Sequence, residues 1–309
     1  MQNSNQYTGK TDISQYAVMT DRNSYSDNVA TLWNRMSPCV LCPHRCRADR
    51  SLGQIGFCGI GDELIVSSAA PHFGEESVLV GPGGSGTIFL AGCNLRCVFC
   101  QNHDISHGRA GRRRSVEQLA WTMLDLQNLG CSNVNFVTPT HLAAPIAAAI
   151  VLARSDGLRL PTIYNSGGYD SVETLRMLEG LIDIYMPDMK YADAEVAERL
   201  SGARDYPTVN FNAVQEMHRQ VGDLQVESGL ATRCLLVRHL VLPNDLAGSL
   251  QIIDFLAEQV SPHTTINIMD QYHPCHQAYR HAEINRRPTR LEVSAPRRHA
   301  LERGLDVLE

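Results

Sequence analysis

Short apolar runs recur along the chain after residue 86, and stretches with helical spacing separate them. Six of these runs are rich in β-branched or aromatic residues, which is typical of buried strands. They span residues 87–91, 133–138, 161–166, 181–187, 233–241 and 265–269. Strands that alternate with helices predict parallel βαβ units.

The clearest helix is predicted between the first two strands. Ser115 and Gln118 have the spacing of a capping box, and Gly130 follows as a helix end. The residues between them place one apolar face on the helix: Val116, Leu119, Ala120, Met123 and Leu124. This helix supports the alternating strand–helix interpretation.

Six strand–helix units suit a partial (β/α)6, TIM-like barrel or an open doubly wound sheet, and periodicity does not separate the two. In both folds ligands bind at the carboxyl ends of the strands. We expect three parts: a polar N-terminal arm (1–36), a small cysteine-rich metal-binding segment (37–80), and the α/β barrel with a C-terminal extension (81–309). The glycine-rich run 81–86 predicts a hinge. It also matches G-x-G-x-x-G, but it leads into a strand, whereas a dinucleotide-binding fingerprint follows a strand and opens a helix.

Composition narrows the class of protein. The 309 residues are 43% hydrophobic and 19% charged, with a net charge of −6, so bulk nucleic-acid binding is not expected. The longest apolar run, 142–153, is shorter than the roughly 20 residues that cross a bilayer, and the first thirty residues lack a secretory signal. We therefore expect a cytoplasmic protein without membrane contact. Disulfides are rare there, so ten cysteines favour metal or redox chemistry.

Three cysteines directly after the first predicted strand carry the strongest signal. Cys93, Cys97 and Cys100 are separated by three and two residues. Three thiolates on one loop can hold three corners of a 4Fe–4S cluster and leave one iron open to a cofactor. A structural zinc site would instead need a fourth ligand, which His103 or His107 could supply.

At these three cysteines, called the motif cysteines below, the sequence resembles the radical S-adenosylmethionine (radical SAM) superfamily. Residues 100–106, 183–190 and 269–274 resemble a branch related to pyruvate formate-lyase activating enzymes, and the resemblance covers about 37–309. It implies a 4Fe–4S cluster and S-adenosylmethionine, whose reductive cleavage gives a 5′-deoxyadenosyl radical that abstracts hydrogen from a substrate. It also implies a flavodoxin- or ferredoxin-type reductant. The substrate is either a glycine of a partner protein, as for glycyl-radical activases, or a small molecule or peptide residue.

Candidate cofactor contacts follow the later strands. The superfamily commonly has Gly-Gly-Glu after the second strand, but this chain has Thr138-Pro139-Thr140-His141, so Thr138, Thr140 or His141 would replace it by position only. Asn165 and Ser166 end the third strand; they bind ribose or carboxylate, or complete a turn. The Asp188-x-Lys190 pattern resembles one in the activases, where the lysine serves an anionic group. A surface pair is the alternative.

The last two strands carry weaker candidates. These are Arg238, His239, Asn244, Gln271 and Tyr272, and also Cys275, a candidate catalytic ligand or hydrogen donor that could equally be a plain loop cysteine. Cys131 and Cys234 read as core residues. The basic run 112–114 reads as a solvated face, with guidance of an acidic electron donor as the alternative.

Four further cysteines precede the barrel: Cys39, Cys42, Cys46 and Cys58. We call them the N-terminal cysteines. Four thiols within twenty residues, with glycines that let the loop fold back, indicate a second metal site. Structural zinc, an auxiliary iron–sulfur cluster and redox-active thiols remain open, as does a non-enzymatic protein that binds zinc or iron through all seven cysteines.

Overall fold

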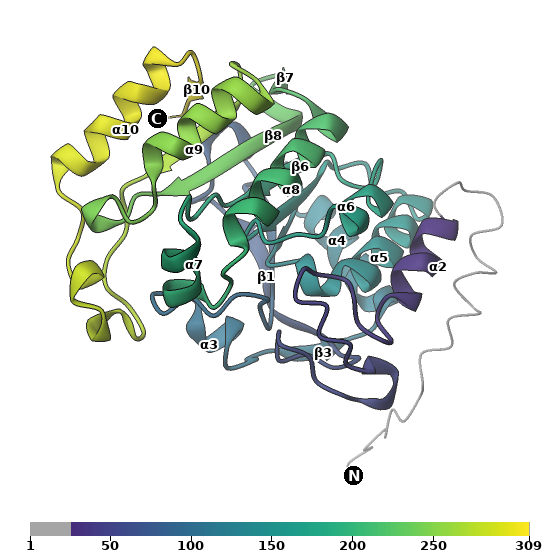
Figure 1. Cartoon of the computed structure of the whole chain (residues 1–309). Helices are drawn as coiled ribbons and strands as arrows, with labels where there is room; N and C mark the ends of the chain where they lie inside the picture. Colours follow the sequence, from purple (N-terminus) through teal and green to yellow (C-terminus); the bar gives the residue numbers. More distant parts are fainter. Residues whose placement is uncertain (1–25, 309) are drawn as a thin grey trace, which may run out of the picture.

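A ten-stranded sheet forms the centre of the computed structural model, which describes residues 26–308 (Figure 1). The strands are β1 (Leu64–His72), β2 (Ser85–Leu90), β3 (Arg112–Arg114), β4 (Val134–Val137), β5 (Thr162–Ser166), β6 (Ile184–Pro187), β7 (Gln225–Glu227), β8 (Leu230–Leu240), β9 (Thr265–Met269) and β10 (Asp306–Val307). Their order is β10-β9-β8-β6-β5-β4-β2-β1-β3, and β7 pairs with β8.

The six predicted strands are β2, β4, β5, β6, β8 and β9, and all neighbours among them are parallel. The prediction of an α/β, partial (β/α)6 TIM-like barrel is confirmed. The sheet is not closed, because β3 and β10 form its two ends. Every residue of β5 and β6 is buried, as expected for parallel strands covered on both faces.

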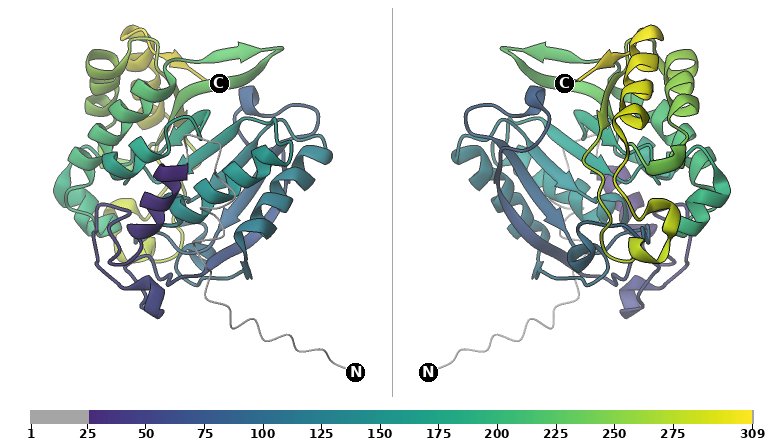
Figure 2. Two further views of the ribbon diagram at one scale, coloured as in Figure 1. Left: turned by 90° about the vertical axis from the view of Figure 1, so that its right-hand side faces the viewer. Right: turned by 90° about the vertical axis from the view of Figure 1, so that its left-hand side faces the viewer.

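Helices line the outside of the curved sheet (Figure 2). They are α2 (Ser26–Asn34), α3 (His103–Ser106), α4 (Val116–Asn128), α5 (Ala143–Ser155), α6 (Val172–Met177), α7 (Ala194–Ser201), α8 (Tyr206–Val221), α9 (Ser249–Phe255) and α10 (Arg290–Glu302). The capping box of α4 is formed as predicted, with Gln118 N donating to Ser115 Oγ at 3.2 Å. None of the described helices is long and apolar enough to cross a bilayer.

The predicted N-terminal arm differs from the structure in its second part. Residues 1–25 lie outside the described residues, but α2 follows them and packs against α5 and α6. Val29, Leu32 and Met36 are buried. Val29 and Leu32 lie three residues apart on one face of α2, which explains the packing, and Met36 follows the end of the helix at Asn34. Residues 26–36 therefore belong to the outer layer of the barrel.

The predicted boundary near residue 80 also differs from the structure. β1, within the predicted cysteine-rich segment, pairs antiparallel with β2 and β3 and so extends the barrel sheet. The glycine-rich run 81–86 is a packed turn, not a hinge, because a Cβ on Gly83 would lie 1.9 Å from the carbonyl oxygen of Gly130. Residues 112–114 are exposed as predicted, on the edge strand β3. These features join the two predicted parts into one sheet.

Candidate active site

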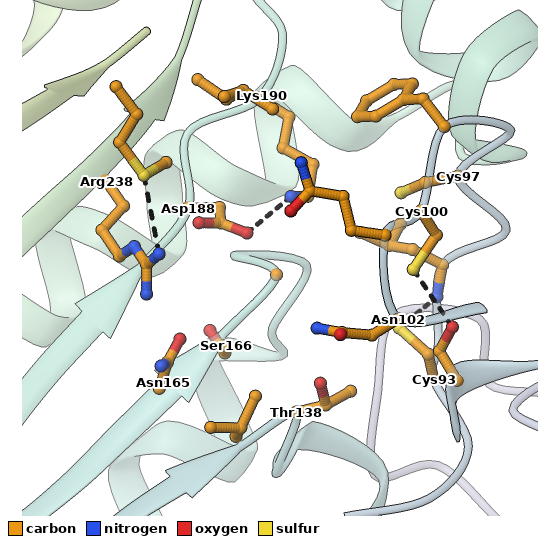
Figure 3. A pocket seen from close by; sticks show the side chains of 18 of the residues that line it. Cys93, Cys97, Cys100, Asn102, Thr138, Asn165, Ser166, Asp188, Lys190 and Arg238 are labelled. Carbon is orange, nitrogen blue, oxygen red and sulfur yellow. Dashed lines mark hydrogen bonds and ion pairs between the residues drawn. The ribbon is translucent and has the colours of Figure 1, made fainter. Parts of the chain in front are cut away.

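A cavity of 320 Å³ lies at the carboxyl ends of the parallel strands. The motif cysteines lie on one side of it, and residues at the ends of β4, β5, β6 and β8 lie opposite (Figure 3). The lining includes eight predicted site residues: Cys93, Cys97, Cys100, Thr138, Asn165, Ser166, Asp188 and Lys190. The weaker candidates Arg238, Gln271 and Tyr272 also line it.

The loop that carries the motif cysteines begins at a glycine that no other residue could replace without strain. Gly92 has a φ of +82°, and a Cβ there would lie 2.5 Å from Ile60 Cγ1 and 2.9 Å from Cys58 O. The next residue, Cys93, donates its N–H to Cys58 O at 3.3 Å. Farther along, Arg96 donates to Ser201 O at 2.9 Å through its backbone N–H. The loop is thus fixed on one side by the N-terminal segment and on the other by α7.

Burial, together with the neighbouring Cys97 and Cys100, raises the pKa of the Cys93 thiol to about 12. Burial also raises the pKa of Cys97, although Lys190 acts in the opposite direction. Thiols in such a place ionise when a metal binds them. Because these three share one loop and one cavity, the donor set fits the three protein corners of a 4Fe–4S cluster.

The alternative of a single zinc ion at the motif cysteines is not supported. His103 and His107 instead pack around His276, with ring centroids 4.6 and 5.2 Å away. Among residues 26–308, no three His, Cys, Asp or Glu side chains are arranged to hold one metal ion. A cluster places each thiolate on a separate iron, so its ligands need not converge on one point.

Asp188 and Lys190 form an ion pair inside the cavity, with 2.5 Å between Asp188 Oδ2 and Lys190 Nζ. Their side chains are 23% and 17% exposed, so the surface-pair alternative is wrong. Burial lowers the pKa of Lys190, but Asp188 raises it, as does Cys97 when ionised, and the net pKa is raised. Lys190 is therefore charged at neutral pH and stands beside the motif cysteines (Figure 3).

Thr138 and Ser166 line the cavity in different ways. Thr138 has a φ of +63°, a left-handed conformation that costs a non-glycine residue about 1–2 kcal/mol. It is held there by its N–H, which donates to Asn165 O at 2.8 Å. The Ser166 hydroxyl donates to the buried Asp170 at 2.6 Å, which leaves Asn165 as the freer side chain of the β5 end.

The remaining candidates do not line this cavity. His141 is buried and donates from Nε2 to Ala91 O at 2.8 Å, and Thr140 donates to Asp170. His239 bonds to Met189 O and Ser249, and Asn244 bonds to Glu283 O. Cys275 is half-buried in the loop after β9 and is not among the lining residues. The structure therefore does not place these residues in the cavity of the motif cysteines.

Sequence reasoning missed the lining residues that come from β1 and the loop after it. His72, Gly74 and Glu75 all line the cavity. β1 begins as an apolar run but continues as Ser67-Ser68-Ala69-Ala70-Pro71, which lacks the composition of a strand. Without that strand, nothing in the sequence brings Glu75 to the barrel.

The N-terminal cysteines lie close to a buried arginine. A Cβ on Gly56 would lie 2.9 Å from Cys46 Sγ and 3.8 Å from Cys58 Sγ, so both thiols crowd that glycine. Arg50 is 1% exposed and lies 4.0 Å from Cys39 Sγ through Nη1. Nε of Arg50 donates to Gly61 O, and Nη1 donates to His141 O. Nη2 has no hydrogen-bond partner among the described residues, and no ion pair joins Arg50 to a described carboxylate.

Comparison with known proteins places this fold and site in a family. The sequence profile of the radical SAM superfamily matches residues 87–237. An uncharacterised protein of Methanocaldococcus jannaschii is 33% identical over 285 residues, which cover 89% of this chain and 78% of the relative. The chain belongs to the radical SAM superfamily.

Other known proteins are similar to this chain at lower identity. Pyruvate formate-lyase 1-activating enzyme of Escherichia coli is 26% identical over 140 residues, which cover 42% of this chain and 55% of that protein. A radical SAM methyltransferase from Sphaerobacter thermophilus has a TM-score of 0.48 at 13% identity, covering 79% of this chain and 76% of that one. The structure of Streptococcus suis SuiB bound to S-adenosylmethionine has a TM-score of 0.47 at 10% identity, and the match covers 70% of this chain and 47% of that one.

Proposed function

We propose that this protein is an enzyme that reductively cleaves S-adenosylmethionine and abstracts hydrogen from a substrate. When bound, the 4Fe–4S cluster and S-adenosylmethionine supply a 5′-deoxyadenosyl radical. The observation that carries the proposal is the convergence of the motif cysteines and the charged Lys190 on one cavity. The superfamily membership supports the same chemistry.

The chain's own task is to bind, orient and exclude water. Lys190 offers an ammonium for a carboxylate of the cofactor or of an anionic substrate, and Asp188 fixes its position. Asn165 offers an amide at the end of β5. Leu95, Phe99 and Tyr272 are buried apolar walls of the cavity that keep water from the motif cysteines.

Two kinds of substrate are consistent with this site. The likeness to the activating enzyme supports a glycine in a partner protein, and a small molecule or peptide residue is the second kind. A flavodoxin- or ferredoxin-type donor would supply the electron. We infer a cytoplasmic setting, because a low-potential donor and reduced thiols belong to that compartment.

Anaerobic reconstitution tests the proposal. The protein with its cluster rebuilt should release 5′-deoxyadenosine from S-adenosylmethionine under dithionite, measured by chromatography and mass spectrometry. Alanine at any motif cysteine should abolish release, whereas the matched controls Cys131→Ala and Cys234→Ala, at buried cysteines outside the cavity, should retain it. Release by the triple motif variant would refute the assignment.

We also infer a second metal centre on the N-terminal cysteines. An iron–sulfur cluster fits them better than a single zinc ion, because no three described His, Cys, Asp or Glu side chains are arranged to hold one ion. Arg50 supports the second centre, because a buried guanidinium that pairs with no described carboxylate needs a negative charge nearby. Four thiolates on a metal carry a net negative charge and would provide it. Metal analysis of the protein lacking the motif cysteines should identify the metal.

A further inference from the structure

A second cavity, of 500 Å³, adjoins the first. The two share Gly74, Glu75, Arg238, Met269 and Gln271 in their linings, so a ligand can extend from one into the other. Figure 3 shows Arg238 across the first cavity from the motif cysteines. The second cavity therefore lies on the side away from the cysteine loop, where a substrate rather than the cluster would bind.

Two carboxylates and one guanidinium meet in this second cavity. The side chains of Glu75 and Glu76 are 8% and 4% exposed. Arg238 lies 3.6 Å from Glu75 Oε2 through Nη1 and 3.4 Å from Glu76 Oε1 through Nε. Since Asp188 already pairs with Lys190, Glu75 and Glu76 exceed Arg238 by one negative charge when both are ionised; burial raises the pKa of Glu75, Arg238 lowers it and Glu76 raises it. A buried excess charge is costly unless a cation compensates it.

The two carboxylate oxygens of Glu76 differ in their hydrogen-bond partners. Asn267 Nδ2 donates to Glu76 Oε1 at 2.9 Å, so that oxygen is satisfied. The other oxygen, Oε2, is buried without a hydrogen-bond partner. Phe73, 64% exposed, lines the same cavity and adds an aromatic ring to it. An unpartnered acceptor next to an aromatic ring suits an ammonium group on an alkyl chain.

We propose that this cavity is a substrate subsite that binds a primary ammonium group at Glu76 Oε2. The substrate class is thus an amine whose alkyl chain reaches from Glu76 into the cavity of the motif cysteines. This inference rests on the proposed function. The ammonium group could belong to the substrate or to S-adenosylmethionine, which also carries one. We assign the subsite to the substrate, because Glu76 lines only the second cavity.

Binding of n-butylammonium to the reconstituted full-length protein with S-adenosylmethionine tests the subsite, by saturation-transfer NMR, with butan-1-ol as the neutral probe. Glu76→Gln keeps the acceptor for Asn267 but removes the charge; Glu75→Gln is the second variant if the first does not fold. Glu63→Gln is the matched control, since Glu63 is 15% exposed, pairs with Arg113 and lies outside both cavities. The assay needs no turnover, so it separates failure of the subsite from failure of cofactor cleavage.

We expect saturable butylammonium binding, at least tenfold weaker binding of butan-1-ol, and at least tenfold weaker butylammonium binding in Glu76→Gln. The Glu63→Gln control should bind like the wild type, and the affinity for S-adenosylmethionine should stay within twofold in Glu76→Gln. Competition between butylammonium and S-adenosylmethionine, with loss of cofactor affinity in Glu76→Gln, would overturn the substrate assignment. Absent or charge-independent binding, as expected if a proton on Glu75 already cancels the charge, would overturn the subsite.

Discussion

Replacing Lys190 by alanine should damage stability and cofactor chemistry by two separate routes. Removing one partner of a buried ion pair leaves the other charge uncompensated, at a cost of about 3–5 kcal/mol. About a fifth of each side chain of the pair with Asp188 is exposed, so we expect a loss near 3 kcal/mol, the lower end of that range. Cleavage of S-adenosylmethionine should fall roughly ten- to a thousandfold, as for a lost positioning contact of about 1.4–4 kcal/mol.

The double variant Lys190→Ala/Asp188→Asn separates these routes. It removes the uncompensated carboxylate, so urea unfolding should show most of the lost stability restored. The ammonium stays absent, so formation of 5′-deoxyadenosine should remain low although the cluster absorbance is unchanged. Full recovery of both stability and cleavage would refute the positioning role, because Lys190 would then only neutralise Asp188.

Arg204→Ala is the matched control for burial. Arg204 Nη1 and Glu198 Oε2 are 2.6 Å apart, close to the distance in the cavity pair, but these side chains are 61% and 54% exposed. Exposed pairs contribute little because water and salt screen them. This variant should unfold and cleave the cofactor like the wild type.

Three further predictions concern buried groups around the site. Burial lowers the pKa of His141 to about 3, from an unfolded value near 6.5. The contribution of neutral His141 to the free energy of unfolding is therefore complete above pH 6.5 and is lost as the pH falls below that value. Urea unfolding of the wild type should lose about 1.4 kcal/mol more than His141→Gln between pH 8 and 5.5; equal slopes would contradict this. Gly92→Ala should lower the free energy of unfolding by about 2–5 kcal/mol, because of left-handed strain and overpacking. Gly130→Ala should lower it by only about 1–2 kcal/mol, because a Cβ there meets nothing within 4 Å. Equal losses in the two variants would show that the loop at Gly92 shifts to accommodate the added Cβ. Elemental analysis of the folded triple motif-cysteine variant should still find metal on the N-terminal cysteines. Complete loss of zinc and iron would show that the two metal centres do not bind independently.

The sequence predicts the parallel strands well because each is buried on both faces. Such strands have mostly apolar sequences, and site residues stand at their carboxyl ends: Cys93 lies three residues after β2, Asn165 lies near the end of β5, and Asp188 directly follows β6. A parallel sheet brings all its carboxyl ends to one edge, so predicting the strands also brings the site residues together. His141 shows the limit of this rule, because position after a strand does not fix where a side chain points.

The antiparallel additions could not be predicted in the same way. β1 is buried only over its first three residues and is exposed or half-exposed beyond them, so its pairing with β2 depends on the whole sheet. The α2 helix is only nine residues long and depends on α5 and α6 for its apolar face. Contacts of this kind are set by tertiary packing, and local sequence patterns do not record them.

The same unpredicted elements control both ends of the cavity. At one end, the segment before β1 holds the cysteine loop, since Cys58 O accepts the N–H of Cys93 and Phe57 O accepts from Arg96. At the other end, the loop after β1 brings Glu75 and Glu76 against Arg238 on β8. A change in the position of β1 would therefore move both the loop of the motif cysteines and the carboxylates of Glu75 and Glu76. We therefore expect changes in the segment 57–76 to affect the cysteine loop and the carboxylates of the second cavity alike.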